Sequence, residues 1–325
     1  MGRQNALNSF GLGATLEFEA NVDAPQGWCR MIDTRTRKPM SWRMRLRPTL
    51  GFTIAELLVV IAVLSVIAGI LLPVLRSARE TAKRAQCLSQ IGQLMKAAVA
   101  YSLDQRDGMW PVIPSWERDT DVEFDSWRFG GKTADATYWG RFYNGALVHQ
   151  ARTRPLNRYL FPDNTLHDPP DTRLELRIFE CPSDYGTLQR SSAWHHDQIV
   201  IRDATISCYD DVGTSYQMNT KWFRRALEEN ASQPPSRRLL KRDVWRKLRP
   251  MFQQAFMVSP ARMVWLSDQT LDLLAIQGQS VSGDHGGLDM SMLGFMDGHV
   301  TYQRAIPKAY ETQTYILKFG SISRQ

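Results

Sequence analysis

Residues 51–75 read GFTIAELLVVIAVLSVIAGILLPVL, and the 19 residues from Leu57 to Leu75 include no charged side chain. At a rise of ~1.5 Å per residue, a helix over these residues is roughly 28 Å long, close to the ~30 Å hydrocarbon core of a bilayer. A buried helix in a soluble protein is the alternative, but such helices seldom run this long without a polar face. The stretch therefore predicts a membrane-spanning helix over residues 54–75.

The charges on either side of this segment predict its orientation. Arg43, Arg45 and Arg47 precede it, whereas the mixed run RSARE, residues 76–80, follows it. Basic residues in short flanking segments favour the cytoplasmic side. A cleaved signal peptide would carry a small-residue cleavage site after the apolar run, but this run ends in LLPVL and continues into a polar helical pattern. We expect the N-terminus to be cytoplasmic and the long C-terminal part to be exported.

Glu56 is a single acid at the edge of the apolar run. A carboxylate carried to the centre of a bilayer costs about 2.5–3.5 kcal/mol. We therefore expect Glu56 to have a partner or a function.

In these residues the sequence resembles the type IV pilin and type II secretion pseudopilin superfamily, whose leader ends in Gly followed by Phe-Thr-x-x-Glu and an apolar helix. The resemblance implies that a prepilin peptidase cuts between Gly51 and Phe52 and methylates the new amino group of Phe52. It also implies that Glu56, the fifth mature residue, pairs with the terminal amine of a neighbouring subunit during assembly.

The same resemblance gives Pro73 a role, because many such pilins bend their helix at the twenty-second mature residue. Two positions depart from the family pattern. Leu50 replaces the usual basic residue before the cleavage site, and Ala55 replaces a bulkier aliphatic residue.

Residues 1–51 are predicted to be the leader. Residues 1–39 show no sustained periodicity, whereas a start at Met44 would give the short basic leader MRLRPTLG that the family uses. Residues 1–43 would then be an over-extended gene start, and a genuine long leader is the alternative.

The composition is that of an ordinary globular chain with one membrane segment, at 43% hydrophobic and 22% charged residues. The formal net charge of +7 suggests a nucleic-acid partner, but residues 1–51 hold eight Lys/Arg and four Asp/Glu. The remainder has 32 basic and 29 acidic residues, a net charge of +3. Because this excess is small, no nucleic-acid partner is expected.

Small and apolar residues continue at helical spacing beyond the membrane segment: Leu75, Ala78, Ala82, Ala85, Leu88, Ile91, Met95 and Ala98. This pattern predicts an amphipathic helix that continues to about Gln105. The N-terminal helix is thus expected over residues 52–106, followed by a globular head over residues 107–325. The stripe of small residues suits close packing against a sheet or neighbouring helices.

Aromatic residues are frequent over residues 108–165: Trp110, Trp116, Trp127, Tyr138, Trp139, Phe142 and Tyr143. They could form a carbohydrate-binding surface or pack as a core over the helix. The core is the commoner use of such side chains.

Three cysteines would remain after cleavage, namely Cys87, Cys181 and Cys208. In an oxidising compartment Cys181 and Cys208 could form a disulfide, which would stabilise the fold by roughly 3–4 kcal/mol in the chain-entropy model. The sequence leaves this pairing open. Cys87 lies on the helix and is expected to be free.

A basic insertion is predicted at about residues 221–250, with the run RRLLKRDVWRKLR at residues 237–249. The run could bind an acidic partner, lipid headgroups or DNA. We favour a solvated helix whose apolar side chains face inward: Leu239, Leu240, Trp245 and Leu248.

The C-terminal third predicts strands at residues 263–268, MVWLSD, and within residues 291–302, SMLGFMDGHVTY. Asp297-Gly298 between apolar residues predicts a β-hairpin with a type I′ turn, which needs positive φ at both central positions.

This part is similar to a large subfamily of pilin-like proteins named for a His followed by nine residues and Asp-Gly. The chain carries the corresponding segments CPSD at 181–184, SYQMN at 215–219, LSD at 266–268, HGG at 285–287 and DGHV at 297–300. Eleven residues separate the His from the Asp here, so longer or bulged hairpin strands are expected. The family-motif residues are Asp268, His285, Asp297, Gly298 and His299.

An enzymatic function finds little support. A metal hydrolase would gather residues such as Asp268, Asp284, His285, Asp297 and His299 around a divalent ion. The sequence contains no His-Glu-x-x-His element, nucleophile elbow or phosphate-binding glycine loop. We expect no catalytic residues and no cofactor, with Asp268 and Asp297 as weak candidates for a structural Ca²⁺ site.

The interpretation is an α+β subunit with one long N-terminal helix packed on an antiparallel sheet, which assembles into a type IV pilus-like or type II secretion pseudopilus-like filament. Its expected partners are the prepilin peptidase, other pilin-like subunits, the assembly platform and the inner membrane. The head would lie in the periplasm or on an extracellular filament. The alternative is a membrane-anchored protein that does not polymerise and binds a glycan or another substrate.

Overall fold

The computed structural model describes residues 51–104, 113–114, 121–123, 126–142, 145, 147–169, 172–191, 201–221, 239–241, 250, 252–254, 257–278 and 280–318. The described residues up to Val59 form one unit, and those from Val60 onward form a second. The predicted leader lies outside the described residues except for Gly51, as does most of the basic insertion.

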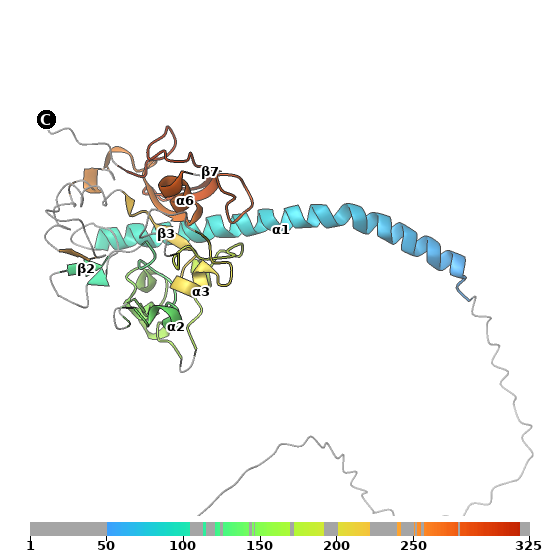
Figure 1. Cartoon of the computed structure of the whole chain (residues 1–325), viewed down its shortest axis with the longest axis horizontal. Helices are drawn as coiled ribbons and strands as arrows, with labels where there is room; N and C mark the ends of the chain where they lie inside the picture. Colours follow the sequence, from blue (N-terminus) through green and yellow to red (C-terminus); the bar gives the residue numbers. More distant parts are fainter. Residues whose placement is uncertain are drawn as a thin grey trace, which may run out of the picture. The chain divides into compact units, whose positions relative to one another are not determined.

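Helix α1 extends from Ile54 to Asp104, and Pro73 lies inside it with helical structure on both sides. Every residue from Gly51 to Arg79 is exposed. The most apolar 18-residue window of α1 has a mean hydropathy of 3.0, and none of that window is buried. By length and composition, this exposed part of the helix could cross a membrane (Figure 1).

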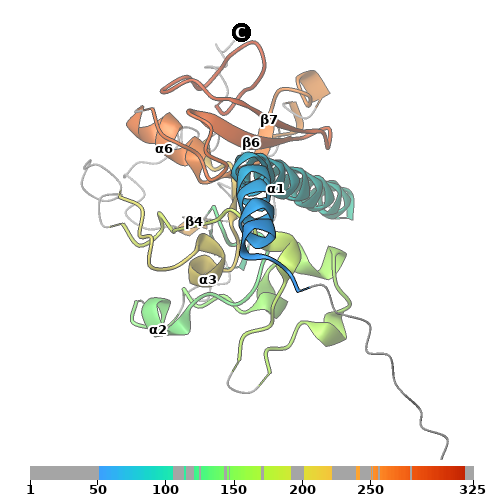
Figure 2. The ribbon, with the colours of Figure 1, turned by 90° about the vertical axis from the view of Figure 1, so that its right-hand side faces the viewer.

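Burial begins in the second half of α1. The buried residues there are Cys87, Gln90, Ile91, Leu94, Met95, Ala97, Ala98, Tyr101 and Ser102. Positions 87, 91, 94 and 98 follow the spacing of one helix face. In Figures 1 and 2 this half of α1 has strands β6 and β7 on one side and the segment with α2 and α3 on the other. The helix therefore lies inside the core of the head.

One side of the core is a four-stranded antiparallel sheet. Its strands, in the order β3-β5-β6-β7, are Tyr216–Met218, Val264–Asp268, Met290–Phe295 and Val300–Arg304. A Cβ atom on Gly294 of β6 would lie 2.8 Å from Cγ2 of Ile91, so the missing side chain lets α1 approach the sheet closely. The predicted α+β class, a long N-terminal helix packed on an antiparallel sheet, is confirmed.

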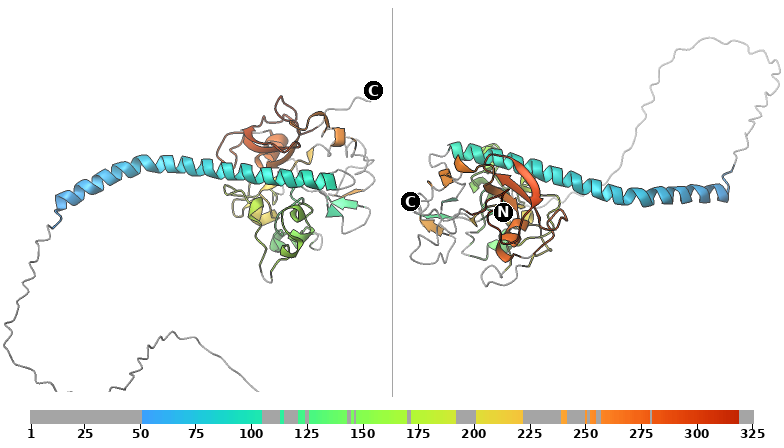
Figure 3. Two further views of the ribbon diagram at one scale, coloured as in Figure 1. Left: turned by 180° about the vertical axis from the view of Figure 1, so that it is seen from behind. Right: turned by 90° about the horizontal axis from the view of Figure 1, so that it is seen from above.

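Side chains alternate between the two faces of the sheet, and strands β5 and β6 are buried on both. In β6, Met292 belongs to the cluster that contains the buried residues of α1. Leu293 and Phe295 belong to a second cluster, with Leu271 and Leu274 of helix α6, Thr270–Gln277. Figure 3 shows the ribbon from behind and from above, with the C-terminal third in orange and red beside the second half of α1.

The predicted C-terminal hairpin forms between β6 and β7, but its turn is not of type I′. The N–H of Gly298 donates to the carbonyl of Phe295 at 2.8 Å, which places Met296 and Asp297 at the centre of the turn. Gly298 has φ +93°, whereas Asp297 has no positive φ. A turn followed by a left-handed glycine is the three-residue alternative to the type I′ loop.

A smaller antiparallel sheet has the order β1-β2-β4, with strands Ile113–Pro114, Asp121–Glu123 and Leu239–Lys241. Strand β4 corrects one prediction, because Leu239 and Leu240 were expected on a helix. They pair with Glu123 and Val122 of β2 instead. The expectation used helical spacing alone and missed the long-range backbone partner. Trp245 and Leu248 lie outside the described residues.

The described residues in the middle of the chain include the short α-helices α2 (Ala136–Trp139) and α3 (Cys208–Val212). They also include the 3-10 helices η2 (Ala151–Thr153), η3 (Asn157–Tyr159), η4 (Asp163–Thr165) and η5 (Arg177–Phe179). Trp127 and Trp139 are buried here with ring centroids 5.7 Å apart. These two aromatic residues form core rather than a glycan surface. Trp110, Trp116 and Tyr143 lie outside the described residues.

Candidate functional site

The first turn of α1 is closed by hydrogen bonds between Thr53 and Glu56. The backbone N–H and the hydroxyl of Thr53 each donate to Oε2 of Glu56 at 2.9 Å, and the N–H of Glu56 donates to Oγ1 of Thr53 at 3.2 Å. This is a capping box, in which the side chains of the N-cap and the third helical residue satisfy each other's backbone N–H. Glu56 therefore has a local structural role, as part of a helix cap, that was not predicted from the sequence.

The predicted processing residues lie just before this turn. Gly51 and Phe52 are exposed, and Phe52 retains 70% of its accessible surface. A side chain on Gly51 would meet no atom within 4 Å. The fold therefore leaves both residues accessible.

A second site lies where α1 enters the head, and it consists of Cys87 on α1, Cys181 just after η5, and His285 in the loop before β6. We call these three residues the thiol cluster. The two sulfur atoms lie 2.8 Å apart, and Nε2 of His285 is 3.4 Å from Sγ of Cys181. All three residues are buried. Among the described residues this is the group of His, Cys and acidic side chains close enough together to hold a metal ion.

The imidazole of His285 is oriented by an acid on the same helix as Cys87. Oε1 of Glu80 lies 2.6 Å from Nδ1 of His285 and also accepts a hydrogen bond from the hydroxyl of Ser183 at 2.9 Å. A carboxylate at Nδ1 favours the tautomer with its proton on that nitrogen. Nε2 of His285 is then left as an acceptor that faces the sulfur of Cys181.

The two thiols of the cluster differ in acidity. The contact with the Cys181 thiol lowers the pKa of Cys87 to about 6, and hydrogen bonding with His285 acts in the same direction. The contact with Cys87 and burial both raise the pKa of Cys181. Burial lowers the pKa of His285, but its hydrogen bonds with Cys87 and Glu80 outweigh this and raise it. Cys87 is therefore the more acidic thiol of the pair.

The walls of the thiol cluster come from the segments that resemble the pilin-like subfamily. The N–H of Cys181 donates to Oγ of Ser215, and that hydroxyl donates to Asp184 at 2.6 Å. The hydroxyl of Tyr216 donates to Gln90 on α1 at 2.7 Å, and the amide of Gln90 donates to the backbone carbonyl of Arg177. The CPSD, SYQMN and HGG segments thus meet on one stretch of α1.

The remaining motif residues lie elsewhere. Asp268 is buried at the end of β5, where it accepts hydrogen bonds from Ser291 and Met292 at the start of β6. Asp297 and His299 lie in the turn at the other end of β6, with Oδ1 of Asp297 2.5 Å from Nδ1 of His299. Residues 291–295 of β6 in extended conformation span roughly 13 Å. The weak Ca²⁺ candidates Asp268 and Asp297 are therefore too far apart to share an ion.

The structure also changes the expected cysteine pairing. Cys181 lies beside Cys87, which was expected to be free, and not in a bridge with Cys208. Cys208 belongs to the buried cluster around Trp127 and Trp139. A bridge between the two cysteines of the head was left as an open possibility, because the sequence does not show which loop meets α1.

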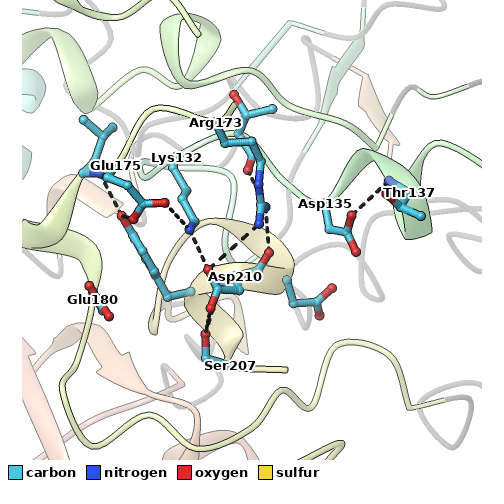
Figure 4. Close-up of polar contacts among 12 residues, drawn as sticks. Lys132, Asp135, Thr137, Arg173, Glu175, Glu180, Ser207 and Asp210 are labelled. Atoms are coloured by element: carbon cyan, nitrogen blue, oxygen red, sulfur yellow. Dashed lines mark hydrogen bonds and ion pairs between the residues drawn. The ribbon is translucent and has the colours of Figure 1, made fainter. Parts of the chain in front are cut away.

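A separate polar network, drawn in Figure 4, surrounds a buried lysine. Nζ of Lys132 lies 2.9 Å from Glu175 and 2.6 Å from Asp210, and 4.0 Å from the ring centroid of Tyr209. Arg173 donates to the backbone carbonyls of Thr133 and Asp210. Because a buried charge needs partners, this network joins three segments of the head. We interpret this network as structural.

Comparison of the chain with protein-family models, with curated proteins and with solved structures gave no match.

Proposed function

We propose that this chain is the structural subunit of a filament of the type IV pilus or type II secretion pseudopilus kind. The observation that carries the proposal is the division of α1 into two halves. Its first half is apolar and fully exposed, whereas its second half is buried in the head. An apolar patch of this size needs a bilayer or a protein partner to cover it. The bilayer would cover the apolar half of α1 before assembly, and the neighbouring helices of the filament would cover it afterwards.

In this proposal a prepilin peptidase cleaves between Gly51 and Phe52 and methylates the new terminus. Residues 54–75 anchor the subunit in the inner membrane with its head in the periplasm, and the assembly platform then transfers it into the filament, which could extend outside the cell. The subunit is structural and not catalytic. The alternative glycan-binding anchor gains no support from Trp127 and Trp139, since both are buried.

Glu56 is the residue that distinguishes a polymerising subunit from an anchored monomer. Its carboxylate accepts two hydrogen bonds from Thr53 within its own helix. In the filament it would also pair with the amine of Phe52 on a neighbouring subunit. The capping role and the pairing role call for different chemistry, because glutamine can complete a capping box but carries no charge.

The test compares Glu56→Gln with Thr53→Ala in cells that assemble the filament. Glu56→Gln leaves the amine unpaired in an apolar environment, and loss of one partner of a buried ion pair costs about 3–5 kcal/mol. We expect its incorporation into purified filaments to fall by two orders of magnitude or more. Thr53→Ala removes the cap, at a cost of about 0.5–2 kcal/mol, but keeps the charge, so incorporation should stay within about thirtyfold of the wild type.

Intact mass spectrometry and membrane fractionation supply the controls, since both variants should still begin at N-methylated Phe52 and remain membrane-bound before assembly. Glu56→Gln protein that enters filaments at wild-type abundance would refute the pairing role. An equal loss of incorporation for both variants would mean that Glu56 acts only as a helix cap.

A further inference from the structure

The thiol cluster joins two parts of the chain that are far apart in sequence. Cys87 lies on α1 and Cys181 lies in the head, 94 residues later, yet their sulfur atoms are 2.8 Å apart. Both side chains are buried. The fold therefore brings the two thiols together at the point where the anchoring helix enters the head.

The distance between the sulfurs is too short for a metal centre. Two thiolates on one tetrahedral zinc ion, with Zn–S bonds of about 2.3 Å, are separated by roughly 3.8 Å. A structural zinc site also needs four protein ligands, and among the described residues three groups converge here. Glu80 cannot serve as the fourth, because its carboxylate already faces Nδ1 of His285.

We propose that Cys87 and Cys181 form a disulfide that fastens α1 to the head, with Cys208 left as a free thiol. This inference rests on the proposed function to the extent that export exposes the head to an oxidising compartment. His285 lies against the pair, and Glu80 fixes its orientation.

The bond forms by thiol–disulfide exchange with a disulfide oxidant, such as a disulfide oxidoreductase of the compartment or oxidised glutathione. The Cys87 thiolate attacks the oxidant and gives a mixed disulfide, releasing one of the oxidant's sulfurs as a thiolate. The Cys181 thiolate then attacks the sulfur of Cys87 and expels the other. Nε2 of His285 accepts the Cys181 proton in this second step. The two protein thiols are oxidised, and the oxidant ends as two thiols carrying the two protons.

Burial determines when this exchange takes place. Cys87 has 0% and Cys181 5% of its surface exposed, so an oxidant reaches the sulfurs before α1 docks into the head. Once α1 is in place, the same burial shields the disulfide from reductants. The disulfide therefore forms during folding and is protected from reduction afterwards.

The experiment begins with the full-length mature protein, reduced and unfolded, and refolds it in detergent with a mixture of reduced and oxidised glutathione. After acid quenching, free thiols are alkylated under denaturing conditions without reductant, and the protein is analysed by intact mass and peptide mapping. We expect a product two hydrogen atoms lighter, a cross-linked peptide pair containing Cys87 and Cys181, and alkylation of Cys208. Cys208→Ser is the matched control and should retain the link.

Three outcomes would contradict a disulfide between Cys87 and Cys181. Three free thiols after refolding, a link from Cys181 to Cys208, or stoichiometric zinc with both cluster thiols reduced would overturn it. Reduction of the linked protein should lower its Tm by about 10 °C, by the stability expected from so long a loop in a domain of this size. The same mapping on protein taken directly from cells tests export separately. A link that forms in the refolded protein and is missing in cells would count against the proposed location and leave the pairing supported.

Discussion

His149 is buried close to the positive charges of Arg128 and Arg154, which disfavours a proton on its ring. Burial lowers its pKa to about 2, and the positive charges of Arg128 and Arg154 act in the same direction. Between pH 6.5 and about 2, His149 is protonated in the unfolded chain but neutral in the folded chain. The free energy of unfolding should therefore decrease as the pH falls below 6.5, by about 1.4 kcal/mol per pH unit. Denaturant unfolding at a series of pH values measures this slope.

His149→Gln removes this contribution and provides the comparison. The difference between the two proteins is needed because Asp284 acts in the opposite direction. Its pKa is raised to about 7, mainly by burial, so its contribution to stability is lost as the pH rises from 3.8 to 7. Parallel pH profiles for wild type and His149→Gln would show that His149 is protonated in the folded protein.

At the same scale, sequence reasoning identified single residues where the signal was local or came from a resemblance. Cys181 and His285 were both noted in this way. Cys87 was expected to be free, and the contact of Glu80 with His285 was not predicted, because no local pattern shows which loop docks against α1. Glu80 and Cys87 are seven residues apart, so they lie on one face of the helix. This spacing was the signal in the sequence that both could contact the same part of the head. The Thr53-x-x-Glu56 capping box had a clear local signal that the processing motif obscured.

Two glycines where α1 packs on the sheet, Gly294 of β6 and Gly92 of α1, should respond oppositely to substitution. A Cβ on Gly294 would lie 2.8 Å from Ile91 and 2.9 Å from Met95. Gly294→Val should therefore destabilise the fold by about 1–3 kcal/mol through overpacking. A Cβ on Gly92 would make an ordinary 3.7 Å contact with Val300, so Gly92→Ala should stabilise α1 by about 0.5–1 kcal/mol.

Urea unfolding of both variants checks this pair of effects. A Gly294→Val protein as stable as the wild type would mean that α1 can move away from the sheet at little cost. A destabilised Gly92→Ala protein would mean that α1 lies closer to β7 than described.

The elements themselves were largely predictable, and their pairings were not. Helical periodicity gave α1, and Asp297-Gly298 gave the hairpin of β6 and β7. The turn type differed because the hydrogen bond from Gly298 to Phe295 moves the turn one residue earlier. Strand β4 was missed because its partner β2 lies more than a hundred residues away in sequence.

For the whole molecule, the exposure of residues 51–79 predicts that the head folds without them. A chain beginning at Arg76 retains every buried residue of α1. It should be soluble without detergent and unfold at the same temperature as the full-length mature protein, since no burial is lost. A chain beginning at Ile91 lacks Cys87 and Gln90 and should fail to give a cooperative thermal transition. Circular dichroism melts compare the two, and a large loss of Tm in the longer chain would contradict the division of α1.

The attachments of α1 to the head are distributed along its axis. Glu80 contacts His285 and Ser183, Gln90 contacts Tyr216 and Arg177, and Asp104 accepts a hydrogen bond from Tyr159. From residue 80 to residue 104 the helix rises roughly 36 Å. A force that pulls on the exposed half of α1 along its axis loads these contacts in shear, all at once. Contacts that are peeled apart break one after another at low force, whereas contacts loaded together resist as a group. A filament built from such subunits could bear tension without extracting the helix from the head.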